Sequence, residues 1–391
     1  MKLPLVQPVR SQKLVRGYGV AAHPSFNTAT YQHTTAWMER LAGMNASSFR
    51  GLYAHNLPSV GLATTQARKL GIGWLATVAP EDWSQSKAEL LTRLKHLRDN
   101  AADVIIGIEG VNEPNHERSG GPPPADWPQR AVAIQKIIWD FVQATPSLAH
   151  VKVVGPSLHA SVPTVHEDHL RLGRLGVQKY MDYAGLHRYF GGRYPDYLID
   201  ERLRWIKEAF GDKRTWVTET GYTNAMANPS GHRPAPEDVS AAYGPICLLE
   251  FAIRGCRSTR YELLDDPDAG VKDDQQANFG LWRTPSHDPA TWTEKPEAGV
   301  MRKFLASLQD PGKKYTPAPV RLDVKAPKGV KRLVVGKRNG SAALLLWQTT
   351  GIYDPHVHKP VAVSAASVRV KTRRHAVRVA VPAGKVVRVR L

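Results

Sequence analysis

Short β-type runs alternate with helical patterns through the first 265 residues of this 391-residue chain. Helical spacing is visible in Leu90, Leu94 and Leu97, and Gly71 stands where a helix C-terminal glycine belongs. Strands separated by helices pair in parallel, and eight such units close into a (β/α)8 barrel, also called a TIM barrel. An open doubly wound sheet is the alternative, because a sequence does not show strand order. The eight predicted strands span residues 17–22, 46–51, 73–78, 104–110, 152–156, 183–187, 215–218 and 259–264.

After residue 310 the apolar pattern changes to period two. In residues 387–390, for example, valine and arginine alternate, which is typical of a strand with one buried and one exposed face. We therefore predict a barrel domain over residues 1–310, ending in a helix at 296–308, and a small antiparallel β-sandwich domain over residues 311–391. The predicted strands of the second domain are 331–336, 342–347, 361–363, 366–371, 376–381 and 385–391.

The positive charge is concentrated in this second domain. The whole chain carries a net charge of +18, and residues 311–391 contain 18 lysines and arginines against only Asp323 and Asp354. Three interpretations remain open: a solvated basic face, contact with an anionic polysaccharide or the cell envelope, or binding of nucleic acid. The last is the least favoured, because no nucleic-acid motif is present and few aromatic residues are available for base stacking.

Two carboxylates follow apolar runs in the first domain. Residues 107–115 read Gly-Ile-Glu-Gly-Val-Asn-Glu-Pro-Asn, and residues 216–222 read Trp-Val-Thr-Glu-Thr-Gly-Tyr. They place Glu113 and Glu219 at the ends of the fourth and seventh predicted strands. A pair of carboxylates on two strand ends is what acid/base chemistry on a glycosidic bond requires. Taken alone, Glu113 could also be an ordinary charge at a helix N-terminus.

Further polar residues gather at the predicted strand ends, and the opposite ends are mostly bland. Because the active sites of barrels lie at the carboxyl ends of the strands, these residues are candidates for substrate contact. His23 and Arg50 could equally be structural pairs. The candidates are His23, Arg50, Asn112, His187, Tyr189 and Glu262.

Asn112-Glu113-Pro114 after the fourth strand, with Thr218-Glu219 after the seventh, resembles the signature of clan A glycoside hydrolases. The resemblance implies hydrolysis of O-glycosidic bonds with retention of configuration, with Glu113 as the general acid/base and Glu219 as the nucleophile. A barrel followed by a β-sandwich is most similar to families 39, 5 and 79, and no single family is matched over the whole chain.

The resemblance extends to other strand ends. His187-Arg188-Tyr189 resembles the His-x-Tyr after strand six, whose tyrosine orients the nucleophile, and either His187 or Tyr189 could have that role. Arg50 resembles the strand-two arginine that keeps the nucleophile ionised by its opposite charge. Asn112 suits a hydrogen bond to the sugar 2-hydroxyl. Glu262 departs from the clan, because it stands where a tryptophan platform is frequent, which implies a different contact with the first sugar.

Two alternatives to hydrolysis stay open. A transglycosylase would use the same residues and transfer the sugar to another sugar instead of water. A barrel that has lost catalysis would only bind carbohydrate. Among the tryptophans, Trp282 is the first choice for stacking on a sugar ring, although most tryptophans are simply core residues.

No cofactor and no metal are expected, because two carboxylates and water suffice for this chemistry. The cluster of His159, His166, Glu167 and His169 has no spacing of a known metal motif. The aspartates at 265, 266, 268, 273 and 274 lack the pattern of a calcium loop.

Cys247 and Cys256 are expected to be free thiols, with a disulfide between them as the alternative. No apolar run is long enough to span a membrane. Residues 1–10 lack the apolar stretch of a signal peptide, but a secreted protein without its leader would look the same. We expect a secreted or cell-envelope location.

Overall fold

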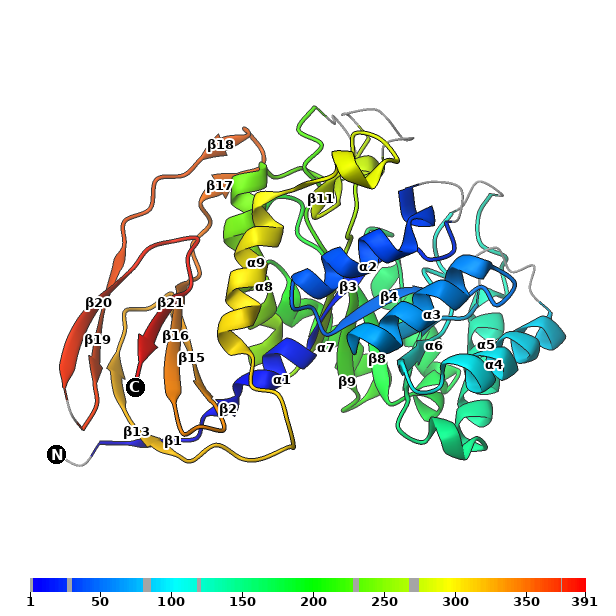
Figure 1. Ribbon diagram of the computed structural model, residues 1–391, viewed down its shortest axis with the longest axis horizontal. Coiled ribbons are helices and arrows are strands. Elements are labelled where there is room, and N and C mark those ends of the chain that lie inside the picture. Colours follow the sequence, from blue (N-terminus) through cyan, green and yellow to red (C-terminus); the bar gives the residue numbers. More distant parts are fainter. Residues whose placement is uncertain are drawn as a thin grey trace.

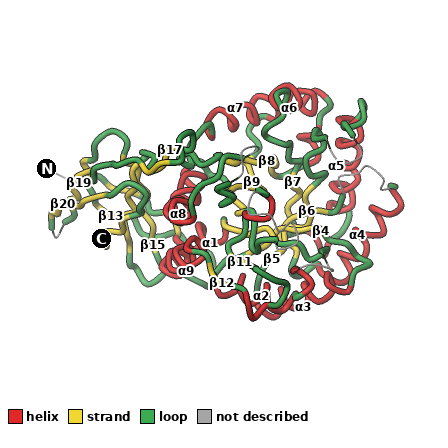
Figure 2. The backbone as a smooth tube through the Cα atoms, turned by 90° about the horizontal axis from the view of Figure 1, so that it is seen from above, coloured by secondary structure: helices red, strands yellow, loops and turns green. Residues whose placement is uncertain are grey.

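The structure is a computed structural model that describes residues 3–26, 30–79, 86–117, 121–227, 232–266, 274–373 and 375–391. Its main part is a closed barrel of eight parallel strands surrounded by helices (Figures 1 and 2). All eight strands were predicted, and the TIM barrel is confirmed. In barrel order they are β3 (Tyr18–Ala21), β4 (Ser48–Leu52), β5 (Gly73–Thr77), β6 (Ile105–Glu109), β7 (Lys152–Val154), β8 (Tyr183–Tyr189), β9 (Arg214–Gly221) and β10 (Arg257–Arg260).

One α-helix follows each barrel strand in the chain. Local signals fix several of their ends: Ser86 and Glu89 form a capping box at the start of α4, and Gly71 ends α3 with a φ of 67°. The helices are α2 (Thr34–Gly43), α3 (Pro58–Leu70), α4 (Lys87–Ala101), α5 (Trp127–Gln143), α6 (Val165–Arg174), α7 (Ile199–Phe210), α8 (Glu237–Ile253) and α9 (Pro296–Leu308), and α1 (Ser11–Arg16) precedes β3.

Short elements complete the chain. The 3-10 turns are η1 (Thr30–Gln32), η2 (Pro146–Leu148), η3 (Val177–Tyr180), η4 (Gln276–Asn278) and η5 (Pro289–Thr291). Three two-stranded pairs are β1 (Leu5–Val6) with β13 (Val320–Arg321), β11 (Trp282–Arg283) with β12 (Thr293–Glu294), and β17 (Tyr353–Asp354) with β18 (Lys359–Pro360).

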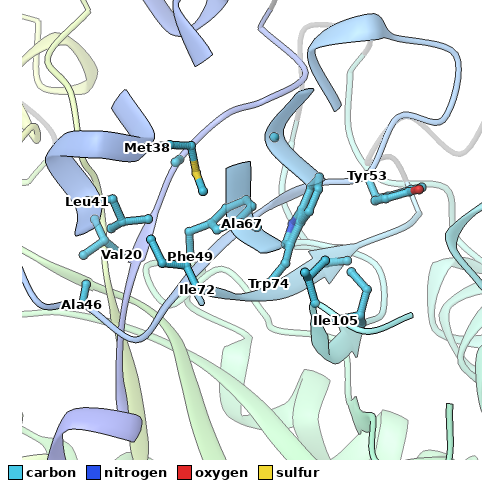
Figure 3. Close-up of a cluster of buried hydrophobic side chains, with 14 of the residues drawn as sticks. Val20, Met38, Leu41, Ala46, Phe49, Tyr53, Ala67, Ile72, Trp74 and Ile105 are labelled. Carbon is cyan, nitrogen blue, oxygen red and sulfur yellow. The ribbon is translucent and has the colours of Figure 1, made fainter. Parts of the chain in front are cut away.

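Apolar side chains between the barrel strands and their helices form the largest core cluster, part of which is drawn in Figure 3. Phe49 of β4 packs against Trp37 of α2 and Trp74 of β5, with ring centroids 5.5 and 4.7 Å away. Trp74 is fully buried, and its indole N–H donates to the Gly51 carbonyl. This tryptophan, which could have been a sugar platform, is therefore a core residue.

Two further sheets face each other at one end of the molecule (Figure 1). One has the order β14-β19-β20 and the other β2-β15-β16-β21. Valines and leucines from both sheets fill the space between them, which makes the predicted β-sandwich. The strands are β2 (Val9–Arg10), β14 (Asp323–Lys325), β15 (Val330–Gly336), β16 (Ala342–Gln348), β19 (Ala366–Lys371), β20 (Ala376–Val381) and β21 (Val387–Arg390).

Two details differ from the expected sandwich. Residues 361–365 form no strand, so the strand predicted at 361–363 is wrong, and the neighbouring β18 ends at Pro360. In addition, β1 pairs with β13 and β2 pairs with β15. Residues at the start of the chain thus share sheets with the C-terminal strands, while the division into 1–310 and 311–391 stays a prediction.

The sandwich packs against the barrel at helix α8. The buried carboxylate of Glu250 accepts hydrogen bonds from the Trp347 indole at 2.8 Å and from Lys331 Nζ at 2.6 Å. Trp347 and Leu345 also share an apolar cluster with Tyr243 of α8. The contact thus combines an ion pair of the buried Glu250 with a continuous apolar cluster, which stabilises the docking of the sandwich on the barrel.

Neither cysteine is in a disulfide: Cys247 is buried and Cys256 is half-buried, both as free thiols. Within the described ranges, no helix has the length and hydropathy that a membrane crossing needs.

Candidate active site

Glu113 and Glu219 lie at the carboxyl ends of the barrel strands. Glu219 is part of β9, and Glu113 follows β6 directly after the bridge between Asn112 and Ser157. The backbone of Glu113 has a φ of 45°, and its N–H donates to the Ser157 carbonyl at 2.8 Å. A non-glycine residue adopts this left-handed conformation only where its surroundings fix it, which is frequent at functional sites.

The two carboxylates meet at the ring of His187. One carboxylate oxygen of Glu113, one of Glu219 and a ring nitrogen of His187 all lie within 4.8 Å of one another. Nδ1 of His187 is 2.8 Å from Oε1 of Glu113 and 3.5 Å from Oε2 of Glu219. The fourth, sixth and seventh strand ends therefore converge on one point.

Both oxygens of Glu219 are held by hydrogen bonds. Arg50 Nη1 donates to Oε1 at 2.8 Å, and the Tyr189 hydroxyl donates to Oε2 at 2.7 Å. Glu219 is only 8% exposed and Arg50 only 5%. These contacts fix the orientation of the Glu219 carboxylate, and one of them is an ion pair with Arg50.

A third carboxylate, Glu109, lies in the same network and was not among the predicted site residues. It is fully buried, and its Oε2 accepts from Arg50 Nε at 2.5 Å. Its other oxygen accepts from the Ser157 hydroxyl at 2.7 Å, and that hydroxyl is 2.7 Å from Thr218 Oγ1. Burial acts to raise the pKa of Glu109, but the charge and hydrogen bond of Arg50 outweigh it and hold the pKa below its ordinary value. Arg50 thus forms ion pairs with two carboxylates, those of Glu109 and Glu219.

We expect Glu109→Gln to lower kcat by roughly 10- to 100-fold, equivalent to an increase of about 1.4–2.8 kcal/mol in the activation free energy. The amide keeps the shape of the side chain but removes its charge. Arg50 would then have Glu219 as its main anionic partner and would reduce the electron density available on that carboxylate. The measurement is kcat of the folded variant, with the thermal midpoint recorded because breaking a buried pair also destabilises the fold. Ser157→Ala, which removes the hydroxyl that contacts Glu109 and Thr218 but changes no charge, is the matched control. A wild-type kcat in Glu109→Gln would contradict this role.

His187 has a perturbed titration as well. Burial acts to lower the pKa of its imidazole, but the charge of Glu219 and the hydrogen bond with Glu113 raise it above the ordinary value. Both neighbouring carboxylates thus favour the protonated form of the imidazole.

A second group lies at the ends of β3 and β10. His23 Nε2 is 2.8 Å from Oε2 of Glu262, and the Tyr31 hydroxyl donates to the same oxygen at 3.0 Å. Tyr261 connects this group to the first one, with ring centroids 5.8 Å from His23 and 6.2 Å from Tyr189. Burial and the negative charges of Glu262 and Glu219 raise the pKa of the Tyr261 hydroxyl far above its ordinary value. The aromatic ring of Tyr261 thus does stand at the end of the eighth strand, one residue before Glu262.

Trp282 is placed differently from the other candidates. It lies in β11, is 8% exposed and belongs to the large apolar cluster of the barrel. Among the described residues, no hydrogen bond or ring contact joins it to the two carboxylates, so its stacking on a sugar stays a prediction.

The donor set that best resembles a metal site in the described ranges is the trio of Glu113, His187 and Glu219 itself. Arg50 and Tyr189 already hold both oxygens of Glu219, so a metal ion would have to displace them. The histidines near residue 160 do not converge: His159 stacks on His116, His166 on Trp205, and His169 lies against Phe210. Of the aspartates, Asp265 pairs with Lys295 at 2.8 Å, while 268 and 273 lie outside the described residues.

No family model and no curated protein matches this sequence. Many solved structures do match the fold, and several of them are glycoside hydrolases. The chain has the fold of clan A glycoside hydrolases. As the sequence predicted, no single family is matched.

Three of these structures illustrate the similarity. The family 51 α-L-arabinofuranosidase AbfB from Bifidobacterium longum is 11% identical with a TM-score of 0.61, and the match covers 97% of this chain and 96% of that one. The family 1 β-glucosidase from Thermotoga maritima is 12% identical with a TM-score of 0.53, over 74% and 97% of the two chains. A β-1,3-glucanosyltransferase from Rhizomucor miehei, an active-site mutant in complex with laminaritriose, is 15% identical with a TM-score of 0.50, over 68% and 93%. At such identities these similarities concern the fold alone.

Proposed function

We propose that the protein is a retaining glycoside hydrolase that cleaves a poly- or oligosaccharide by double displacement. The observation that carries this proposal is the approach of Glu113 and Glu219, whose oxygens lie within 4.8 Å around His187. Retaining enzymes have carboxyl groups about 5–5.5 Å apart, whereas inverting enzymes need roughly 6.5–9.5 Å to admit a water molecule. The short separation supports direct attack by one carboxylate.

In this proposal Glu113 donates a proton to the leaving oxygen while Glu219 attacks the anomeric carbon. Glu219 suits the nucleophile because Arg50 and Tyr189 hold its two oxygens in one orientation. Glu113 then removes a proton from water, which hydrolyses the glycosyl-enzyme and releases a sugar of the original configuration. No cofactor is needed.

Neighbouring side chains would bind the sugar. Arg50 Nη2 donates to Asn112 Oδ1 at 2.7 Å, which orients the amide so that its N–H can donate to the 2-hydroxyl. Glu262 and His23 would hold a pair of hydroxyl groups in the first subsite, because the two side chains lie together at 2.8 Å and present polar atoms.

The test is the anomeric configuration of the first product, followed by NMR during hydrolysis of the best substrate from a panel of plant and bacterial glycans and aryl glycosides. We expect the first-formed sugar to have the configuration of the cleaved bond. An inverted first product would exclude the double displacement. Binding without turnover across the panel would favour the carbohydrate-binding barrel instead.

A transglycosylase is the second candidate, favoured by the same close pair of carboxylates. It differs only in the acceptor that attacks the glycosyl-enzyme. Product analysis at rising acceptor sugar concentration separates the two, because a transglycosylase gives longer oligosaccharides and little free sugar.

The proposal includes a location outside the cell or at the cell envelope, where polymeric substrates lie. It also includes contact with an anionic polysaccharide, which the excess of 18 lysines and arginines over two aspartates in residues 311–391 supports.

A further inference from the structure

The outer face of the sheet β14-β19-β20 carries cations in register. Along β19 the valines at 368 and 370 are buried, whereas Ser367, Arg369 and Lys371 are exposed. The same alternation places Val324, Val377 and Val379 in the apolar cluster between the two sheets. In Figure 1 this sheet is the outermost layer of the sandwich, away from the barrel.

Three of these cations form a row across the three strands. Lys325 is the register partner of Arg369, which in turn is the register partner of Arg378. All three are exposed. Side chains directly opposite in an antiparallel pair have Cβ atoms about 4.5–5.5 Å apart, and like charges in this arrangement destabilise the sheet.

The row has no acidic partner within the described part of the chain. None of the three residues forms an ion pair or a side-chain hydrogen bond there. Lys371 in the next row has the register partners Asp323 and Ala376. An ordinary solvated sheet face mixes both charge signs. A row of unpaired like charges therefore suits a partner that brings several fixed negative charges.

The other positions of this face limit the chemistry of that partner. They are Ser367, Ala376 and Ala380, which are small and exposed. The face thus offers no aromatic ring for stacking on a neutral sugar or on an unpaired base, and no large apolar side chain for insertion into a lipid surface. Binding there has to be ionic and spread over a flat surface.

We propose that this face binds an acidic polysaccharide with carboxylate or sulfate groups. The preference for a polysaccharide over another polyanion rests on the proposed glycoside hydrolase function. Because Glu250, Trp347 and Lys331 fasten the sandwich to α8, a polymer bound on the sheet is held at a fixed distance from the barrel. The face would thus retain the enzyme on its polymer while the barrel acts on it.

The test compares the wild type with the triple variant Lys325→Gln/Arg369→Gln/Arg378→Gln. The matched control is Lys69→Gln/Lys95→Gln/Lys179→Gln, which removes three exposed cations from the barrel domain. Affinity is measured for polygalacturonate, a sulfated glycan, an uncharged glucan and duplex DNA, between about 50 and 200 mM salt.

We expect wild-type binding to both acidic glycans and none to the glucan, weakening as salt rises. The sheet variant should lose about 10-fold or more in affinity and show a shallower salt dependence, while the control stays near wild type. Equal losses in both triple variants, no binding by the wild type, or tighter binding to DNA than to the acidic glycans would each overturn the proposal. Turnover of a small aryl glycoside, measured in parallel, should be unchanged in the sheet variant, so failure of this inference and failure of the proposed hydrolase are distinguishable.

Discussion

Glu219→Ala is expected to lower kcat by roughly 10⁴-fold or more, the scale seen when the nucleophile of a covalent mechanism is removed. Glu219 is the carboxylate whose two oxygens are held by Arg50 and Tyr189, so no neighbouring group can take its position. The fold should survive, because Arg50 keeps its ion pair with Glu109. The measurement is steady-state turnover together with the thermal midpoint.

The role of Glu219 can be separated from a merely structural one by adding azide to the Glu219→Ala variant. This small anion fits the space of the lost carboxyl group and attacks the anomeric carbon from the same side. A single displacement gives a glycosyl azide of inverted configuration. If the variant kept wild-type turnover, or if the azide product retained the configuration, Glu219 would not be the nucleophile.

The barrel was predictable because its signals are local. Apolar runs of strand length alternate with helical spacing, and the carboxyl ends of all parallel strands must meet at one side. The sequence alone therefore predicts that the residues at six strand ends lie close together. Five of them do form one network of hydrogen bonds and ion pairs in the structure: Arg50, Glu113, His187, Tyr189 and Glu219.

Glu109 was missed because it lies inside the predicted strand 104–110, although it is the last residue of the observed one. Whether such a residue points into the barrel or toward the helices depends on strand tilt and register, which the sequence alone does not give. A signal was present, since a carboxylate inside an apolar barrel strand needs a buried partner. Tyr261 was not chosen because the platform position was assigned to Glu262. The eighth strand ends at Arg260, four residues before the predicted end, and Tyr261 is the residue that follows it.

Pairing over long sequence distances was also beyond prediction. Val9 of β2 lies beside Val335 of β15, more than 300 residues later in the chain. No local pattern links two such segments, because their contact depends on how the sandwich docks on α8. The strand expected at 361–363 shows the opposite error. A short valine-rich run has the period-two pattern of a strand, but in the structure it is not part of a sheet.

Glu113→Ala is expected to have an effect that depends on the leaving group. For a natural glycosidic bond the leaving oxygen needs a proton, so kcat/KM should fall by roughly 10²–10⁴-fold. For an aryl glycoside whose phenolate leaves without a proton, glycosylation of Glu219 continues, and the glycosyl-enzyme accumulates because no base activates water. A burst of phenolate followed by slow turnover should therefore be seen by stopped-flow absorbance.

Azide should attack this intermediate from the Glu113 side and yield a glycosyl azide of retained configuration, opposite to the product of Glu219→Ala. Glu117→Ala, which changes an exposed glutamate four residues later, is the matched control and should behave as wild type. An equal loss on both kinds of substrate would show that Glu113 supports the site without transferring the proton.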